Sequence, residues 1–135
     1  MNIPMGSIRL SLVEAATRQT EAAIEAIERG QFDIALTLAG AAEGMIPREG
    51  FHMFAALKAG KPDIDGVTGK QWVTVLNLER DWLKHGGQET MKIECGQAAF
   101  MIARAASKLE VWTPKMDEFK VWLLENIDAI SDIPA

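Results

Sequence analysis

Two side chains suited to chemistry on a phosphate ester lie close together in the sequence. Arg80 and His85 are the ends of the stretch RDWLKH. Histidine titrates near neutral pH and can move a proton, and arginine presents a planar fork of donors to a phosphate oxygen. RNA can be cut without a metal ion when its own 2′-hydroxyl attacks the adjacent phosphate with the help of such a base and such a cation. The pair therefore has the two kinds of side chain that such a reaction requires.

Other polar side chains share the helix face of this pair. Asp81 is four residues before His85, so the two are neighbours on a helix, and Asp81 can orient the imidazole. Asp81 and the negative end of the helix dipole favour a protonated His85. Lys84 adds a phosphate contact. The candidate catalytic residues are Arg80, His85 and Asp81, and the candidate binding residues are Asn77, Lys84 and Glu43.

The stretch from Gln71 to Gly87 positions these residues. Its apolar residues fall on one side of a helical wheel at roughly 100° per residue, which predicts a single amphipathic helix. Gly86 suits the left-handed residue that ends a helix. A polar helix face is also what solvent exposure alone produces, so a merely solvated face is the alternative. The apolar set comprises Trp72, Val75, Leu76, Leu78, Trp82 and Leu83.

A second stretch, Phe32–Ile46, is rich in alanine and glycine. Two glycines inside a helix cost about 1 kcal/mol each relative to alanine, which indicates that another helix passes close by. We expect this helix to be the central and most buried one. Glu43 is its only charge after Asp33, and a carboxylate in such a place needs a partner. Arg80 is the expected partner, and exposure of Glu43 to solvent is the alternative.

The spacing from Arg80 to His85 resembles the R-x4-6-H signature of the HEPN domain, and Asn77 one turn upstream is similar to HEPN-like proteins as well. The stretch Ala35–Glu43, A-x-x-L-A-G-A-A-E, resembles a group of small bacterial proteins of unassigned role. The resemblance implies an all-helical fold found in many prokaryotic ribonucleases and toxins. It also implies a homodimer in which two motif helices face each other across a cleft. Some HEPN relatives have lost activity, bind nucleotides or serve as partner modules.

The rest of the chain also predicts helices. The expected ranges are Ile8–Arg29, with Ser11 and Glu14 as a capping box, Phe51–Ala59, Cys95–Leu109 and Pro114–Ile130. Alternating residues just before Cys95 suggest a short extended piece. The expected architecture is a single all-α domain over residues 1–135, a bundle of five or six helices with residues 1–6 as a loose lead-in.

Composition excludes several classes of function. The net charge of −5 argues against a protein that coats nucleic acid through phosphate contacts, so RNA would meet only a local basic spot. One cysteine and two histidines make a zinc site a poor prediction, and no phosphate-binding loop or hydrolase elbow is present. We expect no cofactor. With no signal peptide and no apolar run near the ~20 residues of a membrane span, we expect a cytoplasmic protein that does not contact membranes.

Three functions remain open on these grounds. The first is an HEPN-like homodimer that acts on RNA or binds a nucleotide phosphate, in which Arg80 and His85 converge in an open cleft. The second is a non-catalytic dimerisation or partner module, in which the side chains of Arg80 and His85 pair with Glu43 or Asp81 or point into solvent. The third and weakest is a small-ligand pocket beneath Trp72, Trp82 and the loop from Lys61 to Gly69, whose glycines and proline predict irregular structure.

Overall fold

The computed structural model describes residues 1–47, 52–61, 66 and 68–131, and within these ranges the chain is helical and contains no strand. An all-α bundle is therefore confirmed. Seven helices lie in the described ranges, because the expected motif helix is two helices. They are α1 (Leu12–Glu28), α2 (Phe32–Met45), α3 (Met53–Ala59), α4 (Gly69–Leu76), α5 (Leu78–His85), α6 (Cys95–Ser107) and α7 (Pro114–Ser131).

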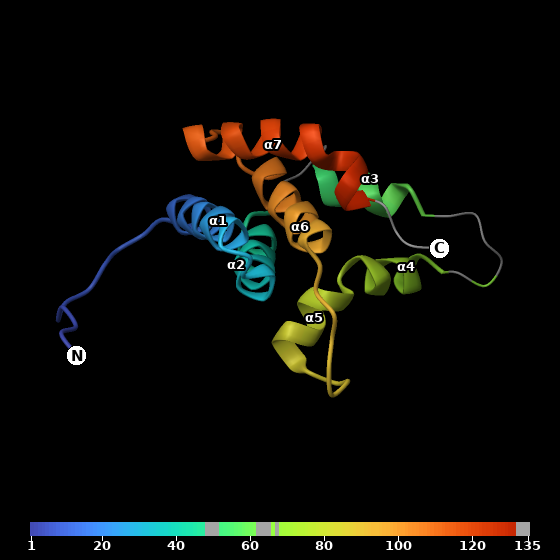
Figure 1. Ribbon diagram of the computed structural model, residues 1–135, viewed down its shortest axis with the longest axis horizontal. Helices are drawn as coiled ribbons and strands as arrows, with labels where there is room; N and C mark the ends of the chain where they lie inside the picture. Colours follow the sequence, from blue (N-terminus) through green and yellow to red (C-terminus); the bar gives the residue numbers. More distant parts are fainter. Residues whose placement is uncertain (48–51, 62–65, 67, 132–135) are drawn as a thin grey trace.

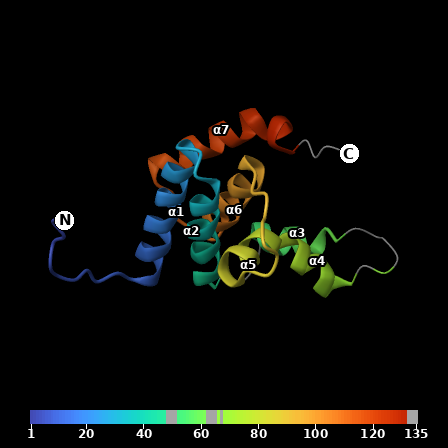
Figure 2. The ribbon, with the colours of Figure 1, turned by 60° about the horizontal axis from the view of Figure 1, so that its bottom comes forward.

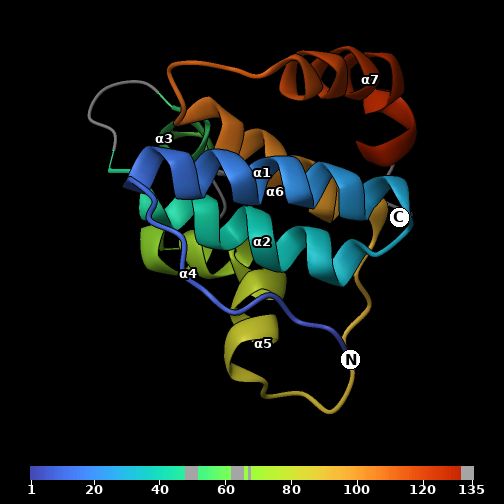
Figure 3. The same cartoon turned by 90° about the vertical axis from the view of Figure 1, so that its left-hand side faces the viewer.

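Helices α1, α2 and α6 form the core of the bundle, and α1 and α2 lie side by side in Figure 3. Most side chains at their contacts are alanines, which let helix backbones approach closely and exclude water. The prediction that α2 is central is confirmed, because α2 contacts α1, α6 and α5. The prediction that it is the most buried helix was wrong, because α6 buries eight of its 13 residues and α2 only six of 14. Fully enclosed core residues include Ala16, Ala23, Ala35, Leu36, Ala39, Ala98, Ala99 and Ile102.

Helix α7 crosses α1 and α6 on one side of the core (Figure 1). Its apolar contacts with the core come from Met116, Phe119, Leu123 and Ile130. Gly96, in the first turn of α6, lies against the backbone carbonyl of Ile130, so a Cβ at this position would overlap α7. The glycine therefore permits the close approach of α7 to the start of α6.

Helices α3, α4 and α5 form the other side of the molecule (Figure 2). Helix α5 packs against α2, and α3 packs against α4 and α6. The prediction of one continuous helix from Gln71 to Gly87 was wrong. The helix breaks at Asn77, whose backbone angles of φ −111° and ψ 8° lie outside the helical range. This break also accounts for the difference between the expected five or six helices and the seven observed.

The predicted capping box of Ser11 and Glu14 is confirmed at the start of α1. Thr68 caps α4 through its side chain. His52 caps α3 by accepting a hydrogen bond from the Ala55 amide at 3.2 Å. Residues 90–94 are not helical. Phe51 and residues 62–65 and 67 of the expected loop lie outside the described residues.

Residues 1–11, which we call the N-terminal arm, have neither helix nor strand. Figures 1 and 2 both show the arm running away from the bundle, from the side formed by α1 and α2. The expected loose lead-in of residues 1–6 thus extends to Ser11, and the expected helix starts at Leu12 instead of Ile8. None of the helices described is both long enough and apolar enough to cross a membrane.

Candidate functional site

A buried carboxylate surrounded by three cations lies where α2, α5 and α6 meet. The Glu43 side chain is 3% exposed. Its Oε2 accepts a hydrogen bond from Arg80 Nη1 at 3.2 Å, which confirms the expected pairing. Its Oε1 lies 3.5 Å from Arg104 Nη2 and 3.4 Å from Lys108 Nζ. We call these four residues the Glu43 cluster.

The two longer contacts in the Glu43 cluster are ion pairs without good hydrogen-bond geometry. Among the described residues, Glu43 Oε1 has no hydrogen-bond partner, although two cationic nitrogens lie within 3.5 Å of it. We therefore attribute their attraction to charge alone. Lys108 Nζ makes its close hydrogen bond, at 2.8 Å, to the backbone carbonyl of Glu43. That contact also places a cation at the negative end of the α2 dipole.

Arg104 connects the Glu43 cluster to the broken helix. Its side chain is 3% exposed, and Nη2 donates to Asn77 Oδ1 at 2.8 Å while Nη1 donates to the Leu76 carbonyl at 3.0 Å. Its guanidinium carbon lies 4.2 Å from the ring centre of Phe54, within cation–π range. Burial lowers the pKa of Arg104, and the charge of Glu43 opposes that shift.

These contacts give a physical reason for the break between α4 and α5. In a continuous helix the Leu76 carbonyl would accept a hydrogen bond from the amide of residue 80. Here that carbonyl accepts from Arg104, and α5 starts with the Asp81 amide donating to the Asn77 carbonyl at 2.8 Å. Asparagine tolerates non-helical backbone angles and supplies an acceptor. Asn77, expected on a ligand-binding face, is instead 6% exposed and serves Arg104.

Arg80 reaches the Glu43 cluster across the surface of Gly40. A Cβ built on Gly40 would lie 2.8 Å from both Cγ and Cδ of Arg80. The expected close contact at α2 therefore exists, but its partner is a side chain of α5 and not a helix backbone. The same expectation was wrong for Gly44, where an added Cβ would meet nothing within 4 Å. Arg80 Nε also lies 3.6 Å from Asp81 Oδ1.

The structure does not bring His85 to this cluster. His85 is the last residue of α5 and is exposed, and within the described residues it makes no hydrogen bond or ion pair. Asp81, the expected partner of the imidazole, is paired with Arg80 instead. Lys84 is exposed. Of the six predicted site residues, the structure brings together Glu43, Arg80 and Asn77, the last through Arg104, and adds Asp81 at the rim.

A groove of about 520 Å³ lies between α2 and α5, beside the Glu43 cluster. Its floor on α2 consists of four small residues and Met45, and its α5 wall carries two cations and one leucine. We call it the α2–α5 groove. Its lining residues are Thr37, Gly40, Ala41, Gly44, Met45, Arg80, Leu83 and Lys84.

The exposed surface of α2 continues this groove along the helix. Ile34, Thr37, Ala41 and Gly44 are exposed and fall at helical spacing on one side of α2, and we call them the α2 face. The only charged residue between Ile34 and the end of α2 is Glu43, which points into the bundle. The α2 face therefore carries no charge over about three turns, which is unusual for a helix surface in contact with water.

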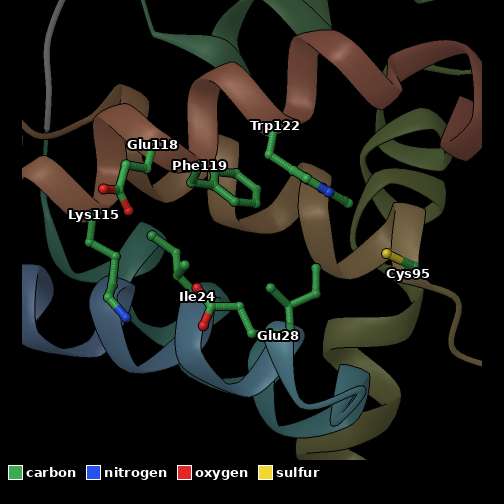
Figure 4. Close-up of a pocket in the computed structure, with 8 residues that line it drawn as sticks. Ile24, Glu28, Cys95, Lys115, Glu118, Phe119 and Trp122 are labelled. Atoms are coloured by element: carbon green, nitrogen blue, oxygen red, sulfur yellow. The ribbon is translucent and has the colours of Figure 1, made fainter.

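A second cavity, of about 400 Å³, lies between α1 and α7 (Figure 4). Ile24, Phe119 and Trp122 supply most of its apolar wall, and Cys95 lies at one end. Burial raises the pKa of the Cys95 thiol, which agrees with a structural role and not with a nucleophile. No group of metal-binding side chains occurs among the residues that the structure describes.

The proposed pocket beneath two tryptophans is not assembled by the described residues. Trp72 Nε1 donates to the Leu57 carbonyl at 2.7 Å, and Trp82 Nε1 donates to the Gln88 carbonyl at 2.7 Å. The two rings thus hold different segments. Residues 62–65 and 67 of the loop lie outside the described residues, so this pocket stays a prediction.

Sequence reasoning missed Arg104 and Lys108. The sequence contained a signal for Arg104, because it is the only charged residue of α6 and lies among alanines that are typical of a buried helix face. A charge in such a position is paired when it is buried. The sequence pattern suggested only Arg80 as a partner for Glu43, although a buried carboxylate can accept hydrogen bonds from several donors.

No family model matches this chain, and the curated proteins and solved structures gave no significant match. The HEPN-like identity therefore stays a prediction from the Arg80–His85 motif and the A-x-x-L-A-G-A-A-E stretch, and the geometry of the Glu43 cluster and the α2–α5 groove is the basis for a function.

Proposed function

We propose that this chain is a non-catalytic helical module that self-associates through the α2 face. The observation that carries the proposal is the pairing of Arg80 with the buried Glu43 at 3.2 Å. An arginine that stabilises charge in a transition state must be free to meet the substrate. Arg80 instead neutralises a carboxylate inside the fold and holds α5 to α2.

The α2 face supports the second half of the proposal. It is uncharged and exposed, and it adjoins a groove with a floor of small residues. Depletion of charge and close-packing residues are features of the cores of protein interfaces. A two-fold dimer uses the same patch on both chains, so one such face suffices.

Sedimentation of wild type and Ala41→Glu tests this proposal. Ala41 is exposed, so the glutamate leaves the fold of the protomer intact and places a charge in the middle of the α2 face. We expect a dimer for wild type and a monomer for Ala41→Glu. Ala129→Glu, the same change at an exposed position of α7, should remain dimeric. A monomeric wild type at all accessible concentrations, or no difference between Ala41→Glu and Ala129→Glu, overturns the proposal.

A second candidate function is the binding of RNA or nucleotide phosphate in the α2–α5 groove. Lys84 and Arg80 both line this groove, and the Arg80 side chain remains 26% exposed. Dimers formed through the α2 face would bring two such grooves together, as the HEPN resemblance implies. In this candidate His85, exposed at the end of α5, supplies the proton transfer that RNA cleavage requires.

Cleavage of mixed single-stranded RNA in the presence of a chelator separates the two functions. Wild type is compared with Lys84→Ala and His85→Ala, which alter only exposed side chains. The non-catalytic module predicts no cleavage by any of the three. Cleavage by wild type that His85→Ala abolishes would establish the second candidate in place of the first, and binding of inorganic phosphate or AMP that Lys84→Ala weakens would show a binding site without catalysis.

A further inference from the structure

The N-terminal arm carries large apolar side chains that stay exposed and are not buried against its own bundle. Ile3, Met5, Ile8 and Leu10 are 64%, 95%, 73% and 38% exposed. Large apolar side chains left in water at this density, on one short segment, mark a surface that another molecule covers. The arm also runs away from the bundle in two views (Figures 1 and 2), so it does not lie on its own protomer.

A surface of matching chemistry lies on the side of the bundle from which the arm departs. The α2 face is uncharged, and the facing α5 wall of the α2–α5 groove carries Leu83 beside Arg80 and Lys84. Helix α2 has 14 residues, or about 21 Å of length. Eleven extended residues reach roughly 36 Å, which is enough to cross a gap between two bundles and still follow the whole of α2.

We infer that the N-terminal arm of one chain lies along the α2 face of a second copy, and that the two copies exchange arms. This inference rests on the proposed self-association and names the segment that accomplishes it. Both the arm and the α2 face are on the α1–α2 side of the bundle, so a two-fold axis in front of that side makes the exchange reciprocal.

The charges of the chain agree with exchange. The arm contains Arg9 and no acidic residue, so all 19 acidic residues lie in the body, and the whole chain carries −5. The arm is therefore attracted at long range to the net negative body of a second copy, and Arg9 must lie away from the α5 wall of the groove, which carries Arg80 and Lys84. Apolar side chains then supply the contact once the arm has arrived.

Two measurements on the full chain test the exchange. In the first, sedimentation compares wild type with the triple variant Ile3→Ser, Ile8→Ser and Leu10→Ser. All three positions are exposed in the protomer, so the fold does not depend on them. The matched control is Val111→Ser, Val121→Ser and Leu124→Ser, three apolar positions that are equally exposed elsewhere on the molecule. We expect the arm variant to dimerise at least about tenfold more weakly than wild type and the control to match wild type.

In the second measurement a benzophenone amino acid replaces Ile8, and this chain is mixed with isotopically heavy wild type and irradiated. Arm exchange predicts cross-linked peptides that join a light arm to a heavy α2. Cross-links only within light chains place the arm on its own protomer and overturn the inference. A wild-type dimer that is unaffected by the arm substitutions overturns the exchange but leaves the proposed function standing, whereas a monomeric wild type removes the proposed function itself.

Discussion

Arg80 Nη1 lies 3.2 Å from Glu43 Oε2, and this contact joins residues that are 37 positions apart on α5 and α2. Arg80 is one of the two residues on which the resemblance to a ribonuclease rests, and Glu43 is the only buried charge on α2. A guanidinium is weakly hydrated and presents several donors in one plane, so it suits a partly buried ion pair better than an ammonium does. The pair secures α5 against the core.

Glu43→Gln should destabilise the fold strongly. The amide removes the negative charge and leaves Arg80, Arg104 and Lys108 facing one another in a buried site. Breaking a buried ion pair by removing one partner costs about 3–5 kcal/mol. Urea unfolding measures this change. Glu25→Gln, which breaks the exposed pair with Lys115, is the control and should cost less than about 1 kcal/mol. Equal unfolding midpoints for the two variants would contradict the role given to Glu43.

Substitution by alanine should change the stability of the fold in opposite directions at two glycines of α2. Gly40→Ala places a Cβ 2.8 Å from the Arg80 side chain, so Arg80 must leave its position beside Glu43 and stability falls. Gly44→Ala meets nothing within 4 Å and gains helix propensity, worth up to about 1 kcal/mol. Thermal unfolding at a protein concentration where the chain is monomeric compares the two. A stabilising Gly40→Ala would show that Arg80 does not depend on the space above this glycine.

Local signals in the sequence account for much of the fold. The structure confirms two predicted helix starts, the capping box of Ser11 with Glu14 and Pro114 at the first position of α7. The small residues of α2 identified the central helix. Each of these signals depends on residues that are close together in the chain, so a single sequence is sufficient to interpret it.

The break at Asn77 could not be predicted from local sequence signals. Residues 71–87 have the apolar period of one helix, and the cause of the break is Arg104, which is 27 positions away. A long-range donor that competes for the Leu76 carbonyl leaves no trace in local periodicity. The positions of the polar side chains of α5 also depend on long-range contacts. Arg80 points toward α2 because it pairs with Glu43, whereas His85 has no such partner among the described residues and is exposed.

Arg104→Lys should not preserve the junction of α4 and α5. One ammonium group cannot reproduce two guanidinium hydrogen bonds that diverge to Asn77 Oδ1 and to the Leu76 carbonyl. A buried acceptor left without a donor costs about 1–3 kcal/mol, which urea unfolding would detect. Arg18→Lys, on the exposed side of α1, should stay within about 0.5 kcal/mol of wild type. Hydrogen exchange should also quicken in the first turn of α5 in Arg104→Lys alone.

The Cys95 thiol should resist alkylation in the native protein, and it should make the free energy of unfolding depend on pH. Burial raises its pKa above the ordinary 9.0, so the native thiol stays protonated where an unfolded thiol ionises. Its contribution to stability is full below 9.0 and is lost as the pH rises through the native pKa. Iodoacetamide at a pH near 9.0 should modify the urea-unfolded chain faster than the native chain. The unfolding midpoint of wild type should fall with rising pH more than that of Cys95→Ala, and parallel pH profiles would contradict this assignment.

Arg80→Ala and His85→Ala should differ in their effect on stability, although the sequence motif pairs them. Arg80 has one contact to Glu43 at 3.2 Å and another to Asp81 at 3.6 Å, so its loss should cost about 1–3 kcal/mol. His85 is exposed and without a partner in the described residues, so its loss should change the unfolding free energy by less than about 0.5 kcal/mol. Adding Glu43→Gln to each variant completes two double-mutant cycles, and coupling should be found for Arg80 alone. A coupling of similar size for His85 would mean that the motif acts as a unit, which is the behaviour of a catalytic pair and not of a structural ion pair with a free histidine beside it.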